Sequence, residues 1–122
     1  MLESILSDPA MRNIYFDISW DVVARYIVAS PETVRIVADL INRYPDRFLF
    51  GTDEVAPSNQ DKYTKIYYQY DPLWKQLTPQ AREAVRKGNY ERLFDAARRN
   101  VRAWEVAHQK ERARNAAPDA MP

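Results

Sequence analysis

The sequence predicts an α/β fold in which a strand, a helix and a second strand form one βαβ unit, followed by several helices. Three features support this prediction: an alternating pattern over residues 13–19, an amphipathic stretch over residues 30–44, and a short apolar run over residues 47–50. Strands connected in this way lie parallel and are joined by a right-handed crossover.

The first predicted strand covers residues 13–19. Its apolar side chains alternate with side chains of another kind: Ile14, Phe16 and Ile18 against Tyr15, Asp17 and Ser19. This period of two is typical of a strand. Residues 1–7 before it favour a short helix that ends before Pro9. Residues 20–29 after it form a connecting segment with loosely helical spacing.

The crossover helix is the best delimited element. Ser30 is a good N-cap, and Pro31 occupies the first helical position, where its missing N–H is not needed. Pro45 ends the helix at the residue before it. The apolar side chains recur every three or four residues and form one face: Val34, Val37, Leu40, Ile41 and Tyr44.

The second predicted strand, residues 47–50, is expected to be buried. Gly51 is expected to release the backbone, which places Asp53 just beyond the strand end. In α/β barrels the catalytic residues lie at the C-terminal ends of parallel strands. Asp53 is therefore the leading functional candidate, and the alternative is a turn aspartate that accepts hydrogen bonds from nearby backbone amides.

Helices are predicted for most of the chain after residue 60. Asp61 is expected to cap the first, which Asp71-Pro72 interrupts. Aromatic side chains share one face of this stretch: Tyr63, Tyr67, Tyr70 and Trp74. The face is most simply core or interface; a platform for stacked nucleic-acid bases is the alternative, although only Lys62 and Lys65 accompany it.

The last two helices are predicted from their end residues. Thr78-Pro79 opens one of them, and Gly88 is expected to close it. Asn89 is expected to cap the other. Its apolar side chains are predicted to form a buried stripe: Leu93, Phe94, Ala97, Val101 and Trp104. Basic residues gather towards this end, but interspersed glutamates make them typical of a solvated helix face.

Two motifs give the chain a resemblance to a known family. Residues 13–19, a helix, and then Arg47-Phe48-Leu49-Phe50-Gly51-Thr52-Asp53 resemble the last two strands of amidohydrolase-related (β/α)8 barrels, which close with RxLFGTD or RVLFGSD. Residues 88–94, Gly-Asn-Tyr-Glu-Arg-Leu-Phe, resemble the closing GNAxRLF helix of that family. The resemblance covers roughly residues 2–104. It implies the C-terminal part of such a barrel, with two parallel strands plus several helices.

The resemblance also implies a chemistry. Such enzymes hydrolyse or decarboxylate small molecules with water activated by a divalent, zinc-like metal, which is bound by histidines and by an aspartate after the last strand. Only the aspartate maps onto this chain, which makes Asp53 the predicted catalytic residue and metal ligand. The one histidine, His108, lies outside these motifs. We therefore expect the chain alone to bind no metal, because zinc takes three or four ligands.

Other polar residues near the strand ends are weaker candidates for a functional role. Ser19 and Trp20 would face the same rim as Asp53 and are candidate substrate contacts. Asp17 is expected to be a buried structural hydrogen-bond partner. Glu54 follows Asp53 directly and is expected to be a solvated loop residue, because adjacent side chains rarely point at one ion.

The composition excludes several classes of function. The chain has no cysteine, which excludes disulfides, thiolate metal sites and cysteine nucleophiles and is compatible with a cytoplasmic protein. No apolar run approaches the ~20 residues that span a bilayer. We expect neither a membrane nor a nucleic acid as a partner.

These observations predict two regions. Residues 1–112 are expected to form the C-terminal portion of an amidohydrolase-like barrel, and residues 113–122 a disordered tail. A complete barrel needs about 250 residues, and two parallel strands alone leave both sheet edges open. We expect a hydrolase segment that is inactive alone and pairs with a complementing N-terminal chain or with its own copies. The alternative is a non-enzymatic helical interaction module that uses its aromatic face.

Overall fold

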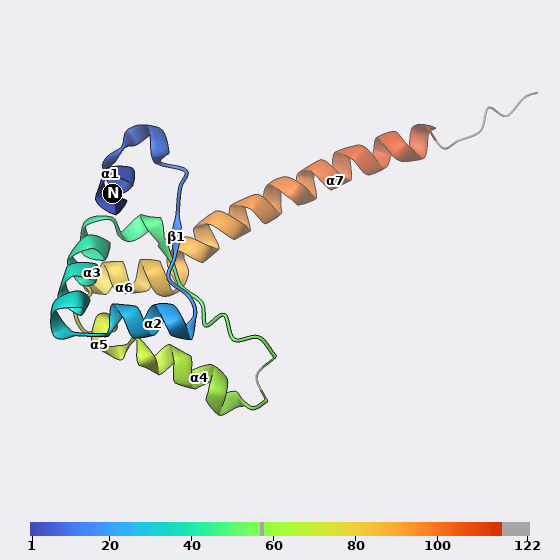
Figure 1. Cartoon of the computed structure of the whole chain (residues 1–122). Coiled ribbons are helices and arrows are strands. Elements are labelled where there is room, and N and C mark those ends of the chain that lie inside the picture. Colours follow the sequence, from blue (N-terminus) through green and yellow to red (C-terminus); the bar gives the residue numbers. More distant parts are fainter. Residues whose placement is uncertain (57, 116–122) are drawn as a thin grey trace, which may run out of the picture. The chain divides into compact units, whose positions relative to one another are not determined.

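A computed structural model of the chain describes residues 1–56 and 58–115 (Figure 1). The chain separates into two compact units, residues 1–90 and the segment that starts at Glu91. Unit 1 contains both strands, and the described part of unit 2 is helical. Within the predicted tail, residues 113–115 continue the last helix, and residues 116–122 lie outside the described residues.

The sheet of unit 1 consists of two parallel strands, β1 (Phe16–Asp17) and β2 (Phe48–Leu49). Phe16 lies opposite Phe48, and Asp17 lies opposite Leu49. The prediction of two parallel strands plus several helices is confirmed, in a chain that is mostly helical.

Both strands are shorter than predicted, because the residues before them turn. The Ile14 N–H donates to the Met11 carbonyl at 3.0 Å, which closes a turn shortly before β1. Arg47 belongs to the 3₁₀ helix η2 (Pro45–Arg47) and enters β2 from it. Parallel pairing therefore starts only at the two phenylalanines.

Two helices of unit 1 begin at the residues predicted to cap them. Ser30 Oγ accepts a hydrogen bond from the Thr33 N–H at 3.1 Å, at the start of α3 (Pro31–Arg43). Thr78 Oγ1 accepts a hydrogen bond from the backbone three residues on, at the start of α6 (Pro79–Glu83). A proline follows each cap, as expected at a first helical position.

The remaining helices of unit 1 are short. They are α1 (Leu2–Ser7), η1 (Pro9–Met11), α2 (Asp21–Ile27), α4 (Gln60–Gln69), α5 (Asp71–Trp74) and the π-helix η3 (Ala84–Gly88). The predicted cap of α4 at Asp61 is wrong: Asn59 Oδ1 accepts from the Lys62 N–H at 3.0 Å, so the helix starts earlier. The predicted connecting segment after the first strand is largely helical, as α2.

Gly88 and Asn89 do not separate two helices as predicted. Gly88 lacks the positive φ of a helix-ending glycine, and the backbone continues helically through Asn89, with φ −68° and ψ −40°. The Asn89 side chain is buried, and its Nδ2 donates to the carbonyls of Pro45 at 2.7 Å and Phe48 at 2.8 Å. Asn89 therefore fixes the approach to β2.

The core of unit 1 lies between the sheet and its helices. The fully buried members include Ile41, Tyr70, Leu73 and Val85. The Phe50 ring, directly after β2, contacts the rings of Tyr70 and Trp74 at centroid distances of 5.0 and 4.9 Å. Two of the four residues of the predicted aromatic face, Tyr70 and Trp74, are thus core residues, whereas Tyr63 is 46% exposed.

A buried arginine connects β2 to the N-terminal segment. Arg47 is 6% exposed, and its guanidinium donates to the carbonyls of Ile14 at 2.8 Å, Met11 at 2.7 Å and Leu6 at 3.2 Å. These bonds satisfy backbone acceptors near the end of α1, at the end of η1 and just before β1. Residues 6–14 are therefore held in place by one side chain from another part of the sequence.

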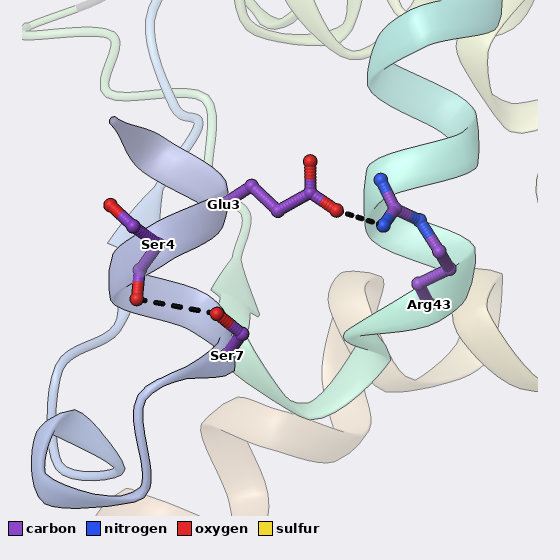
Figure 2. Close-up of polar contacts among 4 residues, drawn as sticks. All are labelled: Glu3, Ser4, Ser7 and Arg43. Carbon is purple, nitrogen blue, oxygen red and sulfur yellow. Dashed lines mark hydrogen bonds and ion pairs between the residues drawn. The ribbon is translucent and has the colours of Figure 1, made fainter.

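A surface ion pair also connects the N-terminal helix α1 to α3. Figure 2 shows the Glu3 carboxylate of α1 paired with the Arg43 guanidinium near the end of α3. Within α1, the Ser7 hydroxyl donates to the Ser4 carbonyl at 3.4 Å (Figure 2). Both charged side chains are about half exposed, so this pair contributes much less than the buried Arg47 bonds.

Unit 2 begins with a π-helix, η4 (Glu91–Asp95), and continues as the long helix α7 (Ala96–Asn115). The predicted buried stripe of this helix is wrong. Phe94, Val101 and Trp104 are 50%, 53% and 60% exposed, respectively. The apolar period is present, but it does not predict burial at these three positions.

None of the helices in the described part of the chain is long and apolar enough to cross a membrane.

Candidate functional site

The two strands present one face to the helices and leave the other open. On the helix side, the Phe16 and Phe48 rings contact each other at 5.9 Å between centroids, and Ile18 is buried in the core. On the other side, the Asp17 side chain is exposed. Because side chains alternate along a strand, the open face of β1 carries Asp17 and Ser19.

Polar groups cluster where this open face ends. The Asp17 carboxylate accepts hydrogen bonds from the Ser19 N–H, at 2.8 Å, and from the Ser19 hydroxyl. Asp17 is thus a hydrogen-bond partner as expected, but the prediction that it is buried is wrong. It lies on the open face because Phe16 and Ile18 fill the core face.

Gly51 lies beside Ser19 at the same end of the sheet. A Cβ added to Gly51 would come within 3.1 Å of the Ser19 Oγ, so a larger residue would displace the serine. Gly51 has no positive φ, and the expectation that it releases the backbone is wrong. Its function is to let the two strand ends approach closely.

Trp20 follows in a strained conformation. Its φ is 88° and its ψ is 143°, outside the usual regions for a residue with a side chain. The buried Tyr70 hydroxyl holds this turn, because it donates to the carbonyls of Ile18 and, at 3.0 Å, Trp20. The Trp20 side chain is 48% exposed.

The Tyr70 hydroxyl keeps its proton. Burial raises its pKa well above the ordinary value of 10.0, and the nearby carboxylates of Asp17 and Asp21 raise it further. The hydroxyl is therefore a donor throughout the neutral range. Sequence reasoning placed Tyr70 on an aromatic face but missed this function, because a contact across about 50 residues leaves no local signal.

Asp53 stands two residues beyond Gly51, in the loop after β2. Its side chain is exposed, and its φ of 49° is left-handed, which aspartate tolerates better than most residues. Asp53 therefore lies at the predicted end of the strand pair, the same end as Ser19 and Trp20. The catalytic, metal-binding and substrate-binding functions of these residues stay predictions.

An open pocket of about 230 Å³ lies at this end of the unit. Its lining combines two carboxylates, two lysines, an amide and one apolar side chain: Asp21, Glu54, Lys62, Lys65, Gln69 and Ile66. The Gln69 Oε1 is buried and has no hydrogen-bond partner among the described residues. Sequence reasoning did not assign these lysines to a site, because their charges alone resemble those of any solvated helix.

The described residues do not fit a complete metal site. Across residues 1–56 and 58–115 there is no group of three His, Cys, Asp or Glu side chains able to hold an ion. The His108 ring stacks on Trp104 within α7, whereas Asp53 belongs to unit 1. Asp53 can offer one carboxylate, while zinc takes three or four ligands.

Comparison with known proteins identifies one family. The family model described as "Amidohydrolase" matches residues 9–96, well over half of the chain. The match includes both strands, Ser19, Trp20, Asp53 and all of the pocket lining. No curated protein and no solved structure matches the chain.

Proposed function

Because the chain belongs to the amidohydrolase family, we propose that it is the C-terminal segment of a (β/α)8-barrel hydrolase, which contributes the last two strands and the carboxylate after them. The observation that carries this proposal is the parallel pair β1–β2, within the family match, with Asp53 beyond the end of β2. In a barrel, that end of the strands faces the substrate.

The remaining strands and metal ligands must then come from another polypeptide segment. β1 and β2 pair only with each other in the described part of the chain, whereas every strand of a closed barrel has two neighbours. We therefore propose that this chain has no turnover by itself and completes a barrel with an N-terminal complement. The substrate is a small molecule whose identity depends on loops of that complement.

Three residues at the strand ends have two distinct functions in this proposal. Asp53 is one metal ligand among several and the catalytic carboxylate of the assembled enzyme. Ser19, held by Asp17 and lying beside Gly51, has its hydroxyl fixed at the rim and contacts the substrate together with Trp20. The strained backbone of Trp20 supports this function, because such strain concentrates at binding sites.

Reconstitution tests the proposal. The chain is co-expressed with the polypeptide encoded upstream of it, and zinc content and hydrolysis of an ester or amide panel are measured for the native chain, Asp53→Asn and Glu54→Gln. We expect Asp53→Asn to lower activity at least about 100-fold and to reduce zinc content, and Glu54→Gln to change little. A fully active, zinc-loaded Asp53→Asn complex would overturn the assignment.

The alternative is a non-enzymatic helical interaction module. It was predicted to use the face of Tyr63, Tyr67, Tyr70 and Trp74, but Tyr70 and Trp74 are core residues. Only Tyr63 and Tyr67 of that face are then accessible to a partner. The exposed side of α7 is the observation that favours a protein–protein interaction, and it is independent of the hydrolase assignment.

A further inference from the structure

Helix α7 carries an uncovered row of side chains at coiled-coil spacing. Ala97, Val101, Trp104 and His108 follow one another at intervals of four, three and four residues along this helix. This is the a/d pattern of a heptad repeat, which forms a seam between two helices. Val101 and Trp104 are 53% and 60% exposed. We call these four residues the seam.

The seam lies beyond the part of the chain that the family accounts for. The family match ends at residue 96, where α7 begins. Most helices in proteins gain their stability from tertiary packing of one apolar face rather than from helix propensity. The described residues of unit 2 provide no such packing for the seam, which leaves it free to pack against the same helix of a second molecule.

Charges beside the seam indicate which molecule this is. Arg98 and Glu105 occupy equivalent flanking positions, one heptad apart. In an antiparallel pair of identical helices, equivalent flanking positions face each other across the seam. When Val101 of one helix packs against Trp104 of the other, Arg98 of each copy lies opposite Glu105 of its neighbour. Two opposite-charge pairs then form by symmetry.

Neighbouring registers lose this complementarity. A shift of one heptad in either direction places Arg98 opposite Arg98, or Glu105 opposite Glu105, across the two copies. A parallel pair would instead match Glu105 with Asn100, which provides no ion pair. The alternating charges thus select one orientation and one register, which is how natural coiled coils specify a partner.

The packing in this register is also complementary in size. Val101 lies opposite the large Trp104, and the small Ala97 lies opposite His108. Within each helix the Trp104 and His108 rings stack at 4.1 Å between centroids, and His108 Nδ1 lies 2.9 Å from the Trp104 carbonyl. These contacts restrict the tryptophan before association, so less conformational entropy is lost on binding.

We propose that α7 is a self-association helix that pairs two copies of this chain in an antiparallel coiled coil through Ala97, Val101, Trp104 and His108. The seam lies outside residues 9–96, which the family model matches, and the proposal does not depend on whether the barrel is completed. It would bring two hydrolase segments together in one assembly.

Sedimentation equilibrium of the full chain between about 1 and 500 μM tests the proposal. We expect a monomer–dimer equilibrium, and a blue shift of tryptophan fluorescence as Trp104 becomes covered. Val101→Glu should raise the dissociation constant by at least about 100-fold, because two carboxylates would enter the seam. Val106→Glu is the matched control: Val106 is 56% exposed on the same helix but lies away from the seam, and the variant should dimerise normally.

The charge pairs provide a test of orientation. Arg98→Glu alone should weaken the dimer by about tenfold, since like charges would then face each other. The combined Arg98→Glu, Glu105→Arg variant restores opposite charges across the seam and should recover most of the affinity. Arg99→Glu is the control, because Arg99 is exposed and lies one heptad before Val106, on the side of the helix away from the seam.

Three results would overturn the proposal. The first is a monomer at all concentrations. The second is a dimer that Val101→Glu and Val106→Glu affect equally, which would indicate association through the open sheet edges of unit 1. The third is a dimer that Arg98→Glu weakens but the charge exchange does not rescue, which would exclude the antiparallel register.

Discussion

Helices α3 and α7 have the same kind of apolar spacing and opposite environments. In α3, Val34, Ala38 and Ile41 are at most 3% exposed, because the helix packs within unit 1. In α7, Val101 and Trp104 stand at equivalent helical spacing and are more than half exposed. The spacing of apolar residues therefore indicates that a face will be covered, but not whether the same molecule covers it.

Unit 1 and α7 also differ in how far apart in the sequence their contacting residues lie. Unit 1 is held by side chains that connect distant parts of the sequence, such as Arg47 to the N-terminal segment and Tyr70 to the turn after β1. The polar contacts of α7 among the described residues are between neighbours three or four positions apart. Such contacts support a helix but do not fix it against anything else.

Replacing Arg47 should give the largest effect on unit 1. Arg47→Met keeps much of the side-chain volume but removes the donor to the buried Leu6 carbonyl and to the part-buried carbonyls of Ile14 and Met11, while the Met11 carbonyl keeps its bond from the Ile14 N–H. We expect a loss of about 4 kcal/mol in the free energy of unfolding, measured by urea titration with circular dichroism. Arg35→Met, on the exposed side of α3, should remain close to the native value. Equal midpoints for both variants would contradict the importance of these bonds.

A matched pair of truncations compares the two helices directly. Ile41→Ala should cost about 3 kcal/mol, because it opens a cavity at a site with 0% exposure. Val101→Ala should change the stability by about 0.5 kcal/mol or less, when measured at protein concentrations below self-association. A large loss for Val101→Ala under these conditions would show that the seam is covered within one chain.

Tyr70→Phe should have an intermediate effect. It leaves the carbonyls of Ile18 and Trp20 without their donor, which we expect to cost about 1–2 kcal/mol at neutral pH. In the native chain, burial raises the pKa of Tyr70, whereas the unfolded tyrosine ionises near 10.0.

The stability from Tyr70 is therefore present below pH 10.0 and lost as the pH rises above it. Urea unfolding between pH 8 and 11, with absorbance to follow tyrosine ionisation, measures this. Tyr70→Phe should lose stability less steeply over that range than the native chain. If the free energy of unfolding changed with pH in the same way for the two proteins, this would contradict the assignment of Tyr70 as the buried donor.

Glu3→Gln should give the smallest change. The hydrogen bond and charge of Arg43 lower the pKa of Glu3 below 4.5. The contribution of the ion pair is therefore present above pH 4.5 and is lost as the pH falls through the lowered pKa. A urea series from pH 7 to pH 3 should show a slightly weaker acid dependence for Glu3→Gln. A large loss at pH 7 would mean that the pair holds α1 in place.

Elements with local signals could be predicted from the sequence. Ser30 and Pro31 fix the start of α3 through hydrogen bonds and backbone angles within a few residues, and Pro45 ends it in the same way. The contacts of Asn89 could not be predicted, because its side-chain amide donates to carbonyls more than 40 residues away in the sequence. A residue type that usually caps a helix here fixes a strand.

The candidate site likewise contains residues that the local sequence pattern predicts and features that depend on tertiary packing. Alternation along the strand placed Ser19 at the strand end, and the position of Asp53 after an apolar run placed it at the same end. The strained turn at Trp20 and its support by Tyr70 depend on tertiary packing, so no pattern of neighbours predicts them. The buried position expected for Asp17 was wrong because the pattern gives the alternation of faces but not which face is covered.

The arginine that connects β2 to the N-terminal segment has a consequence for biosynthesis. Its three acceptors precede it by 33, 36 and 41 residues, and proteins are made from the N-terminus at ~5–20 residues per second. During the seconds before Arg47 leaves the ribosome, the segment around Leu6 and Ile14 has no donor to dock against. That segment therefore leaves the ribosome before Arg47 and reaches its native contacts only after Arg47 has followed it.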